Sequence, residues 1–136
     1  MAIMPKEVQE AFKNVKTFVF TTASAQGQPN GNIIGIKRIV DDETVYVSDQ
    51  FFNKSLANLK ENDKVAIIIT DGDAGYELYG TARYVDEGPE FEAEKKWVDE
   101  YFASKGKAVV AKGGCFVHVD AVYNQTSGPD SGAQIA

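Results

Sequence analysis

Residues 44–65, TVYVSDQFFNKSLANLKENDKV, contain the strand-to-helix junction on which the interpretation of the whole chain depends. Apolar and polar side chains alternate over 44–49, as they do in a half-buried strand. Leu56 and Leu59 then lie three residues apart, and Asn53 occupies the position of a favourable N-cap. The stretch therefore predicts a strand followed by a short helix of about two turns.

Other segments have the alternation, or the aromatic and β-branched composition, that is typical of strands. They are TFVFTTAS (17–24), NIIGIKRIV (32–40), KVAIIIT (64–70), YELYGTARYV (76–85) and CFVHVDAVY (115–123). The segment 64–70 is almost continuously apolar, which is typical of a strand covered on both faces. Gly80 interrupts the segment 76–85 and indicates a bulge, a sharp bend or the close approach of another backbone.

Two further helices are expected, one at the start of the chain and one late in it. Apolar residues recur at helical spacing over about 5–15, where Pro5 suits a first turn. The late helix begins at Pro89, and Gly106 suits its end. Its acidic residues are interpreted as a solvated face, namely Glu90, Glu92, Glu94, Asp99 and Glu100.

These elements predict a mainly β protein, an antiparallel barrel of six strands with helical caps. With 136 residues and no internal repeat, we expect one domain over 1–124. The remaining tail, 125–136, is small, polar and glycine-rich, and we expect it to be mobile unless a partner chain orders it.

Composition excludes several classes of function. A net charge of −6 argues against general nucleic-acid binding, which rewards a basic surface. The single histidine, His118, and the single cysteine, Cys115, are too few for a zinc site of soft ligands, and both are interpreted as structural residues. No run approaches the roughly 20 apolar residues of a membrane span, and the first residues lack a secretory pattern. We therefore expect a cytoplasmic protein.

The start of the short helix has the chemistry of an anion site. A helix start presents unpaired amides and a partial positive charge, to which Lys54 adds an ammonium and Ser55 a hydroxyl. A phosphate would suit this place. The spacing alone favours a surface helix that Asn53 merely caps while Lys54 is solvated.

A wider resemblance favours the phosphate. The segments 32–40, 44–65, 76–85 and 88–97 together resemble, in order and spacing, the flavin-binding split-barrel family typified by pyridoxamine 5′-phosphate oxidase. The chain is most similar to the short FMN-binding members, over roughly residues 8–124. The most specific part is Lys-Ser-x-x-Asn-Leu-x-x-Asn-x-x-Val, which here is Lys54, Ser55, Asn58, Leu59, Asn62 and Val65. The resemblance implies a six-stranded split β-barrel of Greek-key type and a homodimer with flavin at the subunit interface.

The resemblance also implies the roles of particular residues. It places the FMN phosphate on Lys54 and Ser55 at the helix start marked by Asn53, with Asn58 helping from the next turn. It places the isoalloxazine ring along two strand segments, with much of the contact from the backbone. These are Asn32, Ile33 and Ile34 on one side, and Val47, Ser48, Asp49 and Gln50 on the other.

This chain has one basic residue fewer than the family pattern at the start of the short helix. Larger oxidases of the family have two adjacent basic residues where this chain reads Lys54-Ser55. Lys37 or Arg38 is therefore expected to complete neutralisation of the phosphate. Which of the two points inward stays open, because neighbours on a strand face opposite ways.

A bound flavin supplies redox chemistry itself, which explains the lack of a catalytic triad or metal cluster in the sequence. We expect an FMN-binding flavoprotein that acts as a reductase or electron carrier. A true pyridoxamine 5′-phosphate oxidase is the first alternative, although such oxidases carry arginine and histidine in a C-terminal segment, and the tail 125–136 has neither. The second alternative is a protein that stores or senses a flavin, a deazaflavin or haem without catalysis.

Overall fold

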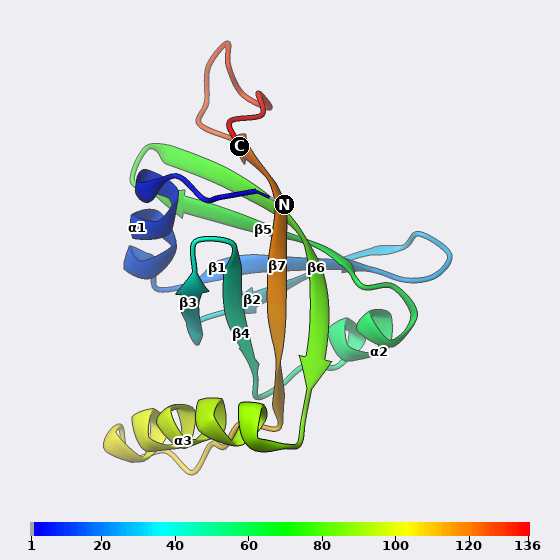
Figure 1. Ribbon diagram of the computed structural model, residues 1–136, viewed down its shortest axis with the longest axis vertical. Helices are drawn as coiled ribbons and strands as arrows, with labels where there is room; N and C mark the ends of the chain where they lie inside the picture. Colours follow the sequence, from blue (N-terminus) through cyan, green and yellow to red (C-terminus); the bar gives the residue numbers. More distant parts are fainter. Residues whose placement is uncertain (1) are drawn as a thin grey trace.

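The structure, a computed structural model that describes residues 2–136, consists of one antiparallel sheet and three helices (Figure 1). The helices are α1 (Lys6–Asn14), α2 (Lys54–Glu61) and α3 (Pro89–Ser104). The strands are β1 (Phe18–Ala23), β2 (Pro29–Ile34), β3 (Lys37–Asp41), β4 (Thr44–Asp49), β5 (Lys64–Asp71), β6 (Ala74–Val85) and β7 (Gly113–Asn124). Within residues 2–136, none of the helices has the length and apolar character to cross a membrane.

The predicted mainly β, antiparallel architecture is confirmed, but the predicted count of six strands is wrong. The expected single strand over 32–40 is two strands, because the chain turns a corner at Gly35 and Ile36. The sheet has seven strands in the order β2-β1-β5-β6-β7-β4-β3. Strands β2 and β3, adjacent in sequence, therefore lie at opposite edges, and the sheet curls without closing because they do not pair with each other.

The core lies inside the curled sheet and is covered at one end by α1, as Figure 1 shows. Helix α1 forms over the predicted stretch and buries its apolar face, with Val8 and Phe12 fully inaccessible. The rings of Phe12 and Phe18 lie 5.3 Å apart. The apolar residues that recur at helical spacing in the sequence thus form the face by which this helix packs on the sheet.

Strand β5 is not covered on both faces within this chain. Val65, Ile67 and Ile69 are buried, whereas Ala66 and Ile68 on the opposite face are half-buried. The expectation from its continuous apolar run is therefore wrong for the single chain, and an apolar outer face remains open to solvent.

Gly80 has the predicted role of a bulge with a close backbone approach. The pairing of β6 with β7 shifts register between Tyr79 and Gly80. A Cβ at position 80 would lie 2.5 Å from the side chain of Val117 and 2.9 Å from the carbonyl oxygen of His118. Only glycine fits this crossing without displacing β7.

Helix α3 is fixed to the sheet by a buried carboxylate. Glu94 is buried, and it accepts hydrogen bonds from Arg38 Nε at 3.0 Å and Nη2 at 2.6 Å and from Trp97 Nε1 at 2.8 Å. The interpretation of Glu94 as part of a solvated face is therefore wrong. A buried charge requires such partners, and here they join α3 to the edge strand β3.

The tail is ordered by β7, contrary to the expectation that it would be mobile. Its chain folds back so that Ile135 N donates to Val122 O at 2.8 Å and Asn124 N donates to Ala133 O at 2.8 Å. Tyr123 and Gln134 form an isolated antiparallel bridge. Backbone hydrogen bonds, which composition does not reveal, hold this segment.

Two glycines at the start of β7 make room for two tyrosine rings. A Cβ at Gly113 would lie 2.2 Å from the hydroxyl of Tyr84, and a Cβ at Gly114 would lie 2.0 Å from the hydroxyl of Tyr46. Tyr46 is fully buried and packs on Phe116, with ring centroids 5.0 Å apart. Because Tyr46 is closely packed, its ring could not move away from a Cβ at position 114.

We therefore expect Gly114→Ala to destabilise the fold by about 1 to 3 kcal/mol through overpacking against Tyr46. Chemical denaturation measures the change in the free energy of unfolding. Gly31→Ala is the matched control, because its Cβ would meet only the Val19 side chain, at 3.4 Å. Equal stability of the two variants would contradict this account of the β7 start.

Candidate functional site

The strand-to-helix junction is held by the side chain of Asp49, the last residue of β4. Its carboxylate is fully buried and accepts hydrogen bonds from Phe52 N at 2.8 Å and from Tyr84 Oη at 2.6 Å. Its carbonyl oxygen accepts from Lys112 N at 2.8 Å. Asp49 therefore supports the junction from inside the fold, and its side chain is engaged in these internal hydrogen bonds.

The start of α2 presents amides and a lysine to solvent. Asn53 is the N-cap, as predicted, but its side chain makes no capping hydrogen bond, so the first-turn amides keep their capacity to bind an anion. Lys54 is exposed. Both Lys54 and Asn58 line a cavity of about 350 Å³, together with residues of the β1–β2 turn and the start of β2, namely Gln28, Pro29 and Asn30.

The side chain of Ser55 faces inward. It is fully buried, donates a hydrogen bond to Asn32 Oδ1 at 2.9 Å and accepts one from Asn30 Nδ2 at 3.2 Å. Asn58 is similarly engaged, since its Nδ2 donates to Thr22 Oγ1 at 3.0 Å. These bonds fasten α2 to β2 and β1, and a role of the Ser55 hydroxyl at a phosphate stays a prediction.

A second cavity, of about 480 Å³, lies at the other end of β2. It brings together predicted residues from both strand segments, namely Asn32, Ile33, Ile34, Ser48 and Gln50. The Gln50 amide donates to the Ser48 hydroxyl and so holds this wall together. Val47 is fully buried and is not among the cavity residues, as is also true of Asp49.

Lys37 and Arg38 are both engaged away from the α2 start. Lys37 Nζ donates to the carbonyl oxygen of Val15, and burial lowers the pKa of this lysine. Arg38 binds the carboxylate of Glu94 through two nitrogens. In this arrangement both cations serve the packing of α1 and α3, and the structure does not bring either to Lys54.

Part of the second cavity comes from residues that the sequence interpretation did not select. They are Lys16, Phe51, Tyr101, Phe102, Lys105 and Lys107, from the end of α3, the segment after it and the connections around the sheet. The signal that could have found some of them is the run of two aromatic residues followed by Lys105 and Lys107 in an acidic chain.

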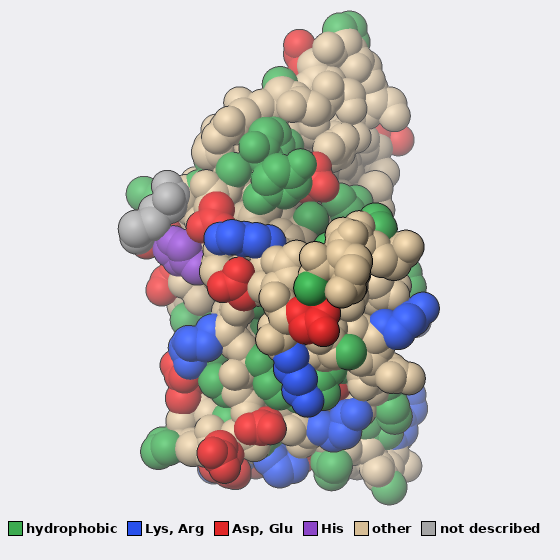
Figure 2. Space-filling view, turned by 90° about the vertical axis from the view of Figure 1, so that its right-hand side faces the viewer, with side chains coloured by type: hydrophobic (Ala, Val, Ile, Leu, Met, Phe, Trp, Pro, Cys, Tyr) green, Lys and Arg blue, Asp and Glu red, His purple; other side chains and the backbone are tan. Residues whose placement is uncertain are grey.

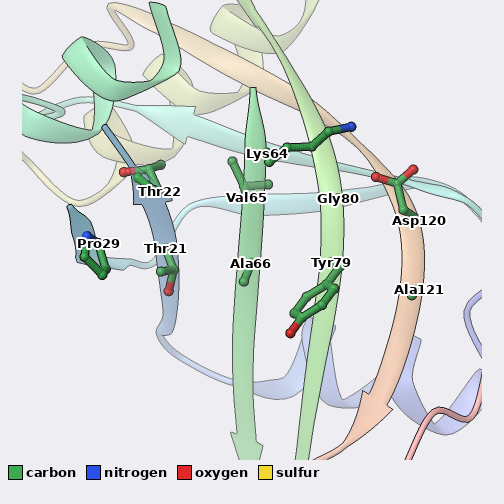
Figure 3. Close-up of a pocket in the computed structure, with 11 residues that line it drawn as sticks. Thr21, Thr22, Pro29, Lys64, Val65, Ala66, Tyr79, Gly80, Asp120 and Ala121 are labelled. Atoms are coloured by element: carbon green, nitrogen blue, oxygen red, sulfur yellow. The ribbon is translucent and has the colours of Figure 1, made fainter. Parts of the chain in front are cut away.

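A third cavity is an apolar groove of about 570 Å³ on the outer face of the sheet (Figure 3). Thr21, Ala66, Tyr79 and Ala121 are register partners in turn and form a row across β1, β5, β6 and β7. Tyr79 is 47% exposed. Figure 2 shows hydrophobic side chains gathered in the upper half of the side of the molecule that it faces. The groove and the α2 cavity share Pro29.

The remaining reactive side chains form no cluster. Among residues 2–136, no group of three or more histidine, cysteine, aspartate or glutamate side chains is placed to hold a metal ion. Burial raises the pKa of the Cys115 thiol to about 12, and the nearby charge of Asp49 adds to the shift. The thiol is thus protonated at neutral pH and is a poor nucleophile.

Comparison with known proteins decides the family. The sequence pattern of the pyridoxamine 5′-phosphate oxidase family matches residues 4–123. The chain belongs to the pyridoxamine 5′-phosphate oxidase family. The uncharacterized protein MJ0282 of Methanocaldococcus jannaschii is 33% identical to this family member, over 98% of the present chain and 88% of the relative.

Solved structures share the fold of this oxidase-family chain. HupZ of Group A Streptococcus is 29% identical, with a TM-score of 0.78, over 96% of this chain and 100% of that chain. An FMN-binding protein from Syntrophomonas wolfei subsp. wolfei is 21% identical, with a TM-score of 0.71, over 88% and 86% of the two chains. The haem storage protein HutZ from Vibrio cholerae (18% identical, TM-score 0.66) and an F420 reductase (14%, 0.65) share the fold alone.

The groups buried around Asp49 predict a loss of stability in alkali. Burial raises the pKa of Cys115 above its ordinary value of 9.0 and those of Tyr46 and Tyr84 above 10.0, and the hydrogen bond to Asp49 raises that of Tyr84 further. The folded state therefore keeps protons that the unfolded state releases. The contribution of these three groups to stability should be constant below about pH 9 and fall as the pH rises above it.

Urea denaturation between about pH 7 and pH 11 measures this effect. Tyr84→Phe should reduce the alkaline slope, because one of the raised phenols is gone. An exposed tyrosine is the control: Tyr101→Phe should leave the slope unchanged. A flat stability profile for the parent protein would contradict the assignment.

Proposed function

We propose that this chain is an FMN-binding flavoprotein that acts as a reductase or electron carrier, in the cytoplasm. The observation that best supports this proposal is that the α2 cavity and the 480 Å³ cavity lie at the two ends of one edge strand, β2. The first offers a lysine and helix amides for a phosphate. The second offers apolar and amide-bearing walls for a ring.

The backbone of β2 suits a flavin. Within the described residues 2–136, this strand pairs only with β1, so the amides and carbonyl groups on its other edge have no strand partner there. Unpaired edge groups can meet the polar rim of an isoalloxazine ring while the exposed side chain of Ile33 contacts its face. When bound, the flavin would supply the hydride and electron chemistry, and the protein would orient it and limit access.

The distance between the two cavities favours FMN over haem. At its usual rise of roughly 3.3 Å per residue, a strand advances about 7 Å from Asn30 to Asn32, the nearest β2 residues of the two cavities, and about 13 Å from Asn30 to Ile34. A ribityl phosphate extends away from its ring and can bridge such a span, past the hydrogen-bonded side chains of Asn30, Asn32 and Ser55. The short propionates of haem carry their charges close to the ring.

Pyridoxamine 5′-phosphate oxidation is the second candidate because the family match carries that chemistry, and a deazaflavin carrier is the third. The absorption spectrum of freshly purified protein, followed by reduction with NADH or NADPH, separates them. A flavin spectrum without turnover of pyridoxamine phosphate supports our proposal. A Soret band, or failure to bind stoichiometric FMN on titration, would overturn it.

Lys54→Ala should weaken FMN by about 1.5 kcal/mol, roughly tenfold in Kd, and leave riboflavin unaffected. The value is at the low end for a charged hydrogen bond, because Lys54 is exposed and solvent screens it. Quenching of flavin fluorescence measures both affinities. Lys60→Ala, an exposed lysine at the other end of α2, is the matched control. Equal losses for FMN and riboflavin would show that the phosphate lies elsewhere.

The same proposal includes a homodimer in which a second copy covers the apolar groove. The near-continuous apolar run of β5 has a half-buried outer face in the single chain, and this face borders the groove. Because the groove shares Pro29 with the α2 cavity, a copy seated there would reach the phosphate end of the site. This supports a cofactor site completed by the partner.

Tyr79→Glu should therefore weaken dimerisation roughly tenfold or more, because an unpaired charge would be buried in the interface. Sedimentation equilibrium measures the dissociation constant. Ile3→Glu, at a residue 63% exposed that does not line the groove, should leave it unchanged. A monomeric parent protein, or a Tyr79→Glu variant that dimerises normally, would contradict the proposed interface.

A further inference from the structure

The phenol oxygen of Tyr46 is the one buried side-chain polar atom in residues 2–136 that has no hydrogen-bond partner. The side chain is fully inaccessible, and burial raises the pKa of its hydroxyl. A buried hydroxyl without a partner has lost its hydrogen bonds to water, so phenylalanine would ordinarily be the more stable residue at such a position. This exception, in a fold whose other buried side chains have partners, calls for an explanation.

The hydroxyl of Tyr46 lies beside the side chain of Ser48. The two residues are two positions apart on β4 and therefore project from the same face of the sheet. Ser48 is the register partner of Gly114 on β7, and a Cβ at Gly114 would lie 2.0 Å from the Tyr46 hydroxyl. The phenol thus fills the space of a side chain opposite Ser48. Burial has the larger effect on the pKa of the phenol, and the neighbouring Ser48 hydroxyl acts in the opposite direction.

Ser48 connects this phenol to the wall of the 480 Å³ cavity. Its backbone is fixed, because Ser48 N donates to Ile36 O at 3.0 Å. Its hydroxyl oxygen accepts a hydrogen bond from Gln50 Nε2, which is the only side-chain partner of this hydroxyl among residues 2–136. Accepting from Gln50 leaves the proton of the Ser48 hydroxyl for another acceptor. The Tyr46 oxygen is the adjacent group that lacks a partner.

Gln50 carries the hydrogen bonds from the buried pair into the cavity. It follows the last residue of β4, lines the cavity and is half-buried, whereas Ser48 is only 1% exposed. With one N–H engaged at Ser48, the amide keeps a second N–H and its carbonyl oxygen free of other side-chain partners within residues 2–136. The Gln50 amide therefore has a donor and an acceptor left for a ligand.

The phenol of Tyr46 determines which way this amide is held. When the Ser48 proton is donated to Tyr46, Ser48 can only accept from Gln50, and the NH₂ end of the amide must face it. Without the phenol oxygen, the same proton is free to bond the Gln50 carbonyl oxygen, and the amide can turn over. The phenol thus removes one of the two orientations of the amide and fixes the order of donor and acceptor in the cavity.

We infer that Tyr46 is a positioning residue of the ring site, which holds the Gln50 amide in one orientation through Ser48, so that the cavity selects a ring edge with an N–H beside a carbonyl group. The imide edge of an isoalloxazine has this pattern. The inference rests on the proposed function, since it takes the ring to lie in this cavity. It adds a residue that determines specificity without touching the ligand.

The test is a double-mutant cycle on the binding of riboflavin, which has the ring without the phosphate. Tyr46→Phe should weaken riboflavin by about 3- to 10-fold in the parent protein, because one hydrogen bond behind the ring site is lost. In the Gln50→Leu background the same change should have no effect, since the amide through which Tyr46 acts is gone. Equal losses in the two backgrounds would overturn the inference.

Tyr76→Phe is the matched control, because Tyr76 is a half-buried tyrosine of β6 that packs against the core and does not line the cavity. It should bind riboflavin as the parent does. Urea denaturation of ligand-free protein adds a second readout. If the Tyr46 hydroxyl has no partner, Tyr46→Phe should stabilise the protein and leave riboflavin binding unchanged, and that result would overturn the inference. Unchanged or reduced stability supports it.

Hydrogen exchange in the ligand-free protein makes the test independent of flavin. The side-chain amide protons of Gln50, followed by NMR of ¹⁵N-labelled protein, should exchange slowly because the NH₂ end is held at a buried hydroxyl. Tyr46→Phe should remove this protection by letting the amide turn over. Protection that is lost in Tyr46→Phe, in a protein that binds no FMN, would reject the proposed flavoprotein and still support the Tyr46–Ser48–Gln50 connection. Protection that does not depend on Tyr46 would overturn it.

Discussion

The candidate site depends on one buried carboxylate, that of Asp49. A buried charge is tolerated only where hydrogen bonds replace its lost hydration, and Asp49 takes them from the turn into α2 and from Tyr84 of β6. Its carbonyl oxygen also binds the segment that leads into β7. The direction in which α2 leaves the sheet, and hence the place of Lys54, follows from this single residue.

The unclosed sheet provides the room for a ligand. Because β2 and β3 are joined by only Gly35 and Ile36 yet lie at opposite edges, the barrel is left split at this corner. The pair of Arg38 and Glu94 then brings α3 against the β3 edge, and the end of α3 walls the opening. Glu94 is buried whereas Arg38 is 41% exposed, and loss of Arg38 would leave the buried carboxylate without its ion-pair partner, so Arg38 is best understood as part of the architecture.

Local periodicity predicts most elements of this fold, because α1, α2, α3 and the bulge at Gly80 are determined by residues close in sequence. No local signal marks the corner at Gly35, because the β-branched composition of 32–40 is that of a single strand. The inward turn of Ser55 and the burial of Glu94 depend on partners 23 and 56 residues away, Asn32 and Arg38. The second cavity joins Lys16 to Lys105, which no local pattern connects.

The lining of the two cavities also fixes the direction in which a flavin would lie. The phosphate could in principle meet the lysines at the α3 end, with the ring at the start of α2. The α2 cavity, however, is the smaller of the two and contains no aromatic residue, so it offers a ring no stacking partner. The larger cavity contributes Ile33, Ile34 and several aromatic side chains. Under the proposed function, the ring would therefore lie beside α3, and the helix amides and Lys54 would remain for the phosphate.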